Sequence, residues 1–528
     1  MAVAGWIREQ RRIYFGNATS VRDYRAQLRG VRASLFWAAY LGLLILFVTV
    51  AYWNIVSQGR QSVAQIQSEL KSFYNLILVL LEVMVALVAP VIVGMSIHAE
   101  RRRQSLDLIL TAPVSPKYFL IGKFVSGYRY IVMLLFLSLP ITAAAVVLGG
   151  ATWSEVLISY VLIATHALLL MAISLPIALL SPKVVSAVIY SYMGCWAVFL
   201  VGSTFSAGMM FTSGFGGLIG SQEGPFWPLM FPNFFGFGIE THTTMFGAQV
   251  PNWILAVAMT LFIVKFFVLA GGSVMTRAGS KETVSLRIHG LVIAALLSFI
   301  LTRDSIASGG FSSGPAAVAY EFAIMVSVLT LPLVVILPHI STWSFFDERK
   351  TRPNGVFSLR AALTSAPEGG LPYLMMLVAA VIMGPFVSTL VGGDRLTTIV
   401  WPYLIWLAGG WAFFWSLGWL LSSFVTTGIA TARKSQLAFT VIIAVLPWPV
   451  IAMLSAAMGT SSDGWIIYPL TALAHEPDEL LIVMFMASEF WLLAAVFGVW
   501  GEWRRKNVVS SYVRRKNEAE PARPWIVR

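Results

Sequence analysis

The sequence predicts an all-α polytopic membrane protein with about twelve transmembrane helices in two six-helix pseudo-repeats. Of its 528 residues, 58% are hydrophobic and only 11% are charged, whereas soluble globular proteins carry about 25% charged residues. The apolar residues form continuous runs long enough to cross a hydrocarbon core as helices, rather than the short alternating segments of a β-barrel. This composition excludes a soluble enzyme of this length and a disordered or coiled-coil protein.

The apolar runs predict six spans in each half of the chain. The predicted spans are 34–56, 74–97, 119–148, 153–180, 185–203, 253–274, 288–303, 317–340, 371–392, 397–425, 435–459 and 479–501. Prolines inside several of them, including Pro140 and Pro176, predict kinks or tilts.

The distribution of basic residues predicts the orientation. If the N-terminus is cytoplasmic, 31 of the 36 Lys and Arg residues fall in cytoplasmic segments, as the positive-inside rule requires. Both termini are therefore predicted to lie on the cytoplasmic side of the cell membrane. The net charge of +12 is explained by topology, so no nucleic-acid partner is expected.

The N-terminal segment 1–33 carries four arginines at helical spacing, Arg22, Arg25, Arg29 and Arg32. This spacing predicts an amphipathic helix over Ser20–Arg32 that lies on the inner surface of the membrane lipid; a solvated flank is the alternative. The segment is too long and too rich in arginine for a signal peptide.

The passage from His98 to Phe124 follows the second span and carries the most information about function. It has a Glu100-Arg101 pair, a short Leu-rich stretch, a Thr111-Ala-Pro113 break and a Gly122-Lys123 step. Leu106, Ile109 and Leu110 share one helix face, and proline stops the helix. A short projecting helix of this kind suits docking into a groove of a soluble partner; an ordinary polar loop is the alternative.

This passage resembles the ABC-2 type permeases, the membrane subunits of ATP-binding-cassette exporters. Members of that family follow their second span with a Glu-Arg pair, a Leu-rich stretch, a Thr-x-Pro turn and a Gly-Lys step. The resemblance implies that the element is a coupling helix in contact with an ATPase. The matching residues are Glu100, Arg101, Leu106, Leu108, Leu110, Thr111, Pro113, Gly122 and Lys123. Gln104-Ser105 departs from the family's usual Gly-Thr.

The second half repeats these anchors. Glu348-Arg349 echoes Glu100-Arg101, and Ser365-Ala366-Pro367 echoes the Thr-Ala-Pro break. Pro113 lies 13 residues after Glu100, whereas Pro367 lies 19 residues after Glu348. Since the family's permeases have six spans and pair as dimers, the chain resembles a fused pair.

The predicted domains follow from these spans. They are an interfacial N-terminal segment (1–33), a first transmembrane half (34–275, coupling helix near 98–118), a cytoplasmic linker (276–287), a second half (288–503, coupling segment near 341–370) and a basic cytoplasmic tail (504–528).

The chain contains no GxxxxGK[ST] phosphate loop, the motif that cradles nucleotide phosphates. No catalytic residue and no cofactor are therefore expected in this chain. The resemblance implies that ATP and Mg²⁺ bind a separate ATPase, with two cytoplasmic ATPase subunits for each permease chain.

Ionisable residues within membrane spans are candidates for function. Here they are Glu82, His166, Lys265, Glu321 and Glu489. A proton relay through Glu82 and Glu321 would make the protein a proton-coupled secondary transporter, whereas interhelical pairing would give the residues a structural role. The six histidines do not fall at metal-ligand spacing and Cys195 is the single cysteine, so no metal site is expected.

The segment 202–252 lacks Lys and Arg and is rich in Gly, Phe and Met. It predicts re-entrant or interfacial helices on the outer side. Because the spans offer few charges, an amphipathic or lipid-like molecule, a hydrophobic drug or a polymer is the expected substrate.

Overall fold

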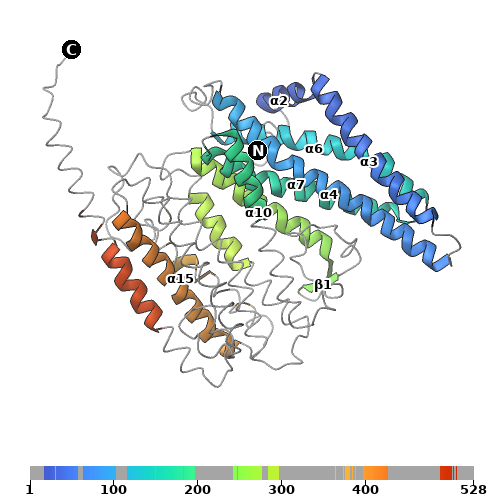
Figure 1. The fold of residues 1–528 in the computed structure, drawn as a ribbon. Helices are drawn as coiled ribbons and strands as arrows, with labels where there is room; N and C mark the ends of the chain where they lie inside the picture. Colours follow the sequence, from blue (N-terminus) through green and yellow to red (C-terminus); the bar gives the residue numbers. More distant parts are fainter. Residues whose placement is uncertain are drawn as a thin grey trace, which may run out of the picture. The chain divides into compact units, whose positions relative to one another are not determined.

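A computed structural model describes the chain in part, and the elements are shown in Figure 1. The described residues are 17–29, 31–57, 63–102, 116–148, 150–181, 183–196, 242–245, 248–275, 284–296, 397–425 and 488–501, with scattered residues at 363–387 and 503–507. The chain divides into two units, Met1–Thr276 and Arg277–Arg528, which are described separately.

The first unit is helical over most of its described length. Its labelled helices are α2 (Ala18–Leu28), α3 (Val31–Ser57), α4 (Val63–Arg102), α6 (Pro116–Val147), α7 (Trp153–Leu180) and α10 (Asn252–Met275). A further helix covers 184–196. Four of these seven helices, α3, α6, α7 and α10, begin and end within a few residues of a predicted span, and α7 matches its prediction of 153–180.

Four helices of the described chain are long and apolar enough to cross a membrane. They are Gln67–Arg102, Tyr118–Val147, Trp153–Leu180 and Ala256–Met275, and shorter apolar helices lie at 34–50, 184–196, 284–296, 412–421 and 488–501. These helices make the chain a multi-pass membrane protein. The count of twelve spans stays a prediction, since the predicted spans 317–340 and 435–459 lie outside the described residues.

Helix α7 is the centre of the first unit, and it packs against α4, α6 and α10. Most of its residues from Val156 to Leu179 are buried. It begins with a capping box, in which the Thr152 hydroxyl accepts from the Glu155 backbone N–H and the Glu155 carboxylate accepts from the Thr152 N–H. Such a box satisfies two donors that a helix start otherwise leaves unpaired.

Helix α4 is longer than its predicted span of 74–97. Polar contacts hold both extensions: Lys71 lies 3.6 Å from Glu155 at the start of α7, and Glu100 and Arg101 bind neighbouring elements at the other end. Pro90 lies inside α4, and Pro140 and Pro176 lie inside α6 and α7. The helices continue through all three prolines.

A short β-hairpin precedes α10 and corrects the prediction for the end of segment 202–252. Strand β1 (His242–Met245) pairs antiparallel with β2 (Ala248–Pro251), with Met245 opposite Ala248. The β-branched Thr243 and Thr244 favour a strand, and two residues separate the strands, as in a tight hairpin. The prediction of helices was wrong for 242–245 and 248–251, and residues 202–241 lie outside the described residues.

The second unit is described through a helix at 284–296, helical residues between 363 and 387, α15 (Thr397–Val425) and a helix at 488–501. Helix α15 matches its predicted span. The last helix packs along it, because the Trp491 indole donates to the Ile405 carbonyl at 3.1 Å and Phe413 contacts Phe490. The described elements of both units are therefore helices, apart from the single hairpin.

Candidate functional site

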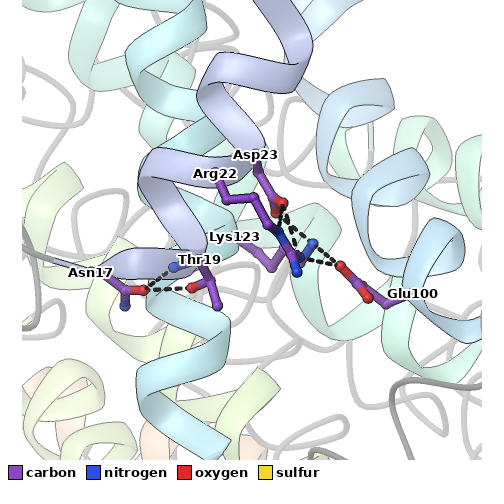
Figure 2. Close-up of polar contacts among 6 residues, drawn as sticks. All are labelled: Asn17, Thr19, Arg22, Asp23, Glu100 and Lys123. Carbon is purple, nitrogen blue, oxygen red and sulfur yellow. Dashed lines mark hydrogen bonds and ion pairs between the residues drawn. The ribbon is translucent and has the colours of Figure 1, made fainter.

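Charged residues gather where α4 ends and α6 begins, and α2 lies beside them (Figure 2). Glu100 comes from the end of α4, Lys123 from the start of α6, and Arg22 and Asp23 from α2. The Lys123 ammonium lies 2.7 Å from a Glu100 carboxylate oxygen and 2.5 Å from an Asp23 oxygen. The Arg22 guanidinium lies 2.7 Å from the same Glu100 oxygen. Two cations and two anions thus form one network across three helices.

The centre of this network is buried. The side chains of Lys123 and Glu100 are only 4% and 5% exposed, and the side chain of Asp23 is 13% exposed. Buried charges are tolerated when they are paired and hydrogen-bonded. Lys123 needs both acids, because a lysine that lost them would be left as an unpaired cation inside the protein.

Arg22 lies at the exposed edge of the network, with a side chain that is 59% exposed. Partial burial lowers the pKa of Arg22, but the hydrogen bond and charge of Asp23, together with Glu100, outweigh that effect and raise its pKa above the usual value. Arg22 therefore stays a cation at every physiological pH.

The start of α2 is fastened to α6 by a set of hydrogen bonds around Tyr118. The Asn17 side chain caps α2 by accepting from the Thr19 N–H at 3.1 Å, and its amide donates to the Tyr118 carbonyl at 2.8 Å. The Ala18 N–H donates to the Tyr118 hydroxyl at 3.3 Å. A side chain at Gly122 could not fit here, because a Cβ would lie 2.0 Å from the Thr19 hydroxyl oxygen. Gly122 thus permits the close approach of α2, and Lys123 binds Asp23 of that helix.

Arg101 binds a different neighbour from Glu100. Its guanidinium donates to the Leu179 carbonyl at 2.8 Å and to the Ser181 carbonyl. Both carbonyls lie at the end of α7, where helices leave carbonyl groups without intrahelical partners. The Glu100-Arg101 pair therefore joins the end of α4 to α2 and α6 on one side and to α7 on the other.

The segment 103–115 connects the end of α4 to the start of α6. The network of Arg22, Asp23, Glu100 and Lys123 beside these two helix ends is called the charged base. The predicted coupling residues within it, Leu106, Ile109, Leu110, Thr111 and Pro113, lie outside the described residues, as do Glu348, Arg349 and Pro367 of the second half. Their coupling role stays a prediction.

The predicted amphipathic helix over Ser20–Arg32 was wrong at its end. Helix α2 ends at Leu28, Arg29 is extended, and α3 begins at Val31, so Arg32 belongs to the first span. Glycine at position 30 has a low helix propensity, which favours this break. Arg25 and Arg29 are exposed, as expected for the polar face of an amphipathic helix.

Two of the five intramembrane candidates come together. The imidazole Nδ1 of His166 on α7 contacts a carboxylate oxygen of Glu82 on α4, and both residues are buried. Lys265 on α10 and Glu489 on the helix at 488–501 are exposed at the surface of their units, and Glu321 lies outside the described residues. Among the described residues, no group of His, Cys, Asp and Glu has the arrangement of a metal site.

The sequence interpretation missed Asn17, Asp23 and Tyr118 as members of the site. Asp23 carried one usable signal, since it is the only acidic residue between positions 10 and 68. A lone acid within an arginine-rich segment indicates a specific partner for a cation.

The long apolar helices define a multi-pass helical membrane protein. Residues 31–206 match the family model described as ABC-2 family transporter protein, so this part of the chain is similar to that family. The matched region includes α3, α4, α6 and α7, and with them Glu100, Arg101, Gly122 and Lys123. No curated protein and no solved structure matches the sequence.

Proposed function

We propose that this permease is the membrane subunit of an ATP-driven exporter, with both six-span halves in one chain. Two ATPase subunits bind at the cytoplasmic side and hold the ATP and Mg²⁺. The protein lies in the cytoplasmic membrane with both termini inside, since 31 of its 36 basic residues then face the cytoplasm.

The charged base of the 103–115 segment carries this proposal. A coupling element transmits force only if its two ends are held, and here the α4 end and the α6 start are joined by the Glu100–Lys123 ion pair at 2.7 Å. Arg101 holds the same α4 end to the last carbonyls of α7. Motion imposed on 103–115 by an ATPase would therefore reach α4, α6 and α7 together.

A similar contact in the second unit supports the fused-pair arrangement. Tyr118 opens the third span of the first half, and its hydroxyl accepts from the Ala18 N–H. Tyr373 opens the third predicted span of the second half, and its hydroxyl donates to the Arg287 carbonyl at 2.8 Å. In both units, a tyrosine at the start of the third predicted span thus binds the backbone of an element near the start of that unit.

The substrate class follows from the surfaces that the spans offer. Apolar and aromatic side chains dominate, so an amphipathic or lipid-like molecule, a hydrophobic drug or a weakly polar polymer is favoured. A photoreactive lipid should label the spans in competition with such a substrate, and transport of a small inorganic ion without labelling would contradict this assignment.

The partner is tested by purifying the full-length chain together with the ABC ATPases encoded near it. The expected result is a complex with two ATPase subunits for each permease, which hydrolyses ATP. The competing assignment is a proton-coupled secondary transporter. It would be favoured if no ATPase co-purified and transport followed a proton gradient that substitution of Glu82 or Glu321 abolished.

A further inference from the structure

The Glu82–His166 contact lies at the centre of the first unit. Glu82 is in the middle of α4 and His166 is in the middle of α7. Glu82 is fully buried and His166 is 6% exposed. The second Glu82 oxygen has no hydrogen-bond partner among the residues that the structure describes. His166 is therefore the one described residue that we find bound to this carboxyl group.

A carboxyl group in the middle of a membrane span is costly and needs a partner. A carboxylate and a neutral imidazole together carry one negative charge. When the pair binds one further proton, its net charge is zero. In that state the pair satisfies one oxygen of Glu82 and adds no net charge to the bundle. The contact thus joins α4 to α7 at the depth where an unpaired carboxylate would be least stable.

Other polar contacts join the same helices nearer their ends. Toward the start of both helices, the Tyr74 hydroxyl donates to the Ser159 hydroxyl at 3.2 Å in a buried position. At the end of both helices, Arg101 donates to the carbonyls of Leu179 and Ser181. Lys71 of α4 also lies 3.6 Å from Glu155 at the start of α7. Helices α4 and α7 therefore run parallel with polar contacts near both ends, and Glu82–His166 lies between them.

We infer that the Glu82–His166 pair is a positioning contact that makes α4 and α7 move as one body during transport. Helix α4 is continuous from Glu82 to Glu100, a rise of about 27 Å, so displacement at the charged end reaches the middle of the membrane through α4. The pair then passes that displacement to α7. This inference rests on the proposed function, because it takes the charged end as the place where the ATPase acts.

The test uses a double variant, Glu82→Leu with His166→Leu, in the full-length complex. Removing one partner would leave an unpaired polar group and could prevent folding, whereas replacing both by apolar residues is generally tolerated. The double variant should bind the ATPase and hydrolyse ATP, but transport at least tenfold less substrate for each ATP. The swapped variant, Glu82→His with His166→Glu, should restore most of that ratio.

Thr165→Val is the matched control. Thr165 is a neighbour of His166, and its hydroxyl donates to the Val161 carbonyl of its own helix, so it makes no such contact with α4. Its variant should keep the transport-to-ATP ratio. An unchanged ratio in the double leucine variant would overturn the inference, as would failure of the swap to restore a lowered ratio.

A second measurement separates this inference from the proposed function, because it needs no ATPase. Spin labels at Leu87 on α4 and Val161 on α7, both exposed, lie about one turn from the pair in sequence. In a permease with Cys195→Ser, the distance distribution between the labels should be narrow, broaden in the double leucine variant and narrow again in the swap. An unbroadened distribution would overturn the positioning contact even if an ATPase binds, whereas a broadened one supports it even if none binds.

Discussion

Lys123→Met should lower the free energy of unfolding by about 3–5 kcal/mol, the range observed when one partner of a buried ion pair is removed. Lys123 is the cation between Glu100 and Asp23, and its loss removes the buried positive charge from both acids. Because Asp23 belongs to α2, this helix should also detach from α6. Unfolding in mixed micelles measures the stability, and the rate of trypsin cleavage after Arg25 and Arg29 measures the release of α2.

Lys71→Met is the control for the loss of a lysine in an ion pair. Lys71 is 56% exposed and lies 3.6 Å from Glu155, and exposed pairs contribute at most about 1 kcal/mol. It should leave both the unfolding free energy and the cleavage of α2 near the wild-type values. Equal effects of the two methionine substitutions would show that the charged base does not hold α2 and α4 in place.

Leu106→Asp combined with Leu110→Asp should abolish assembly with the ATPase while the permease still inserts into the membrane. The two leucines share a face with Ile109 by their helical spacing, and a carboxylate placed in an apolar groove is strongly unfavourable. Co-purification measures assembly, and the yield of membrane-inserted permease shows that folding is retained.

The equivalent change in the second half, Leu359→Asp with Leu363→Asp, should have a milder effect. That segment is longer between its Glu-Arg pair and its proline, so we expect the two halves to couple unequally to the ATPases. If the Leu106 and Leu110 variant assembled and hydrolysed ATP normally, the 103–115 segment would be an ordinary loop.

The helices were predictable where hydropathy alone decides them. The α7 and α15 bounds follow from apolar runs with sharp ends, and α7 begins at a Thr-x-x-Glu capping box that is visible in the sequence. The length of α4 was not predictable in this way. Its two ends are polar, and Lys71 and Arg101 there contact partners on α7 that lie far away in sequence.

The candidate site was predictable as a set of residues but not as a network. Glu100 and Arg101 are adjacent in sequence, and the sequence pattern indicates a single pair that precedes a coupling helix. On a helix with 3.6 residues per turn, neighbours point about 100° apart, so the two side chains bind different elements. The partner of Glu100 on α2 is 78 residues away in sequence, and no local pattern indicates a contact over that separation.

Transport by the reconstituted complex tests the central claim most directly. Vesicles that contain the permease, with its ATPases facing outward, receive a fluorescent amphipathic substrate in the outside medium, and ATP or a proton gradient is supplied separately. We expect movement of the substrate away from the ATPase side with ATP and none with the gradient alone. Transport driven by the gradient without ATP would contradict the assignment as an ATP-driven exporter.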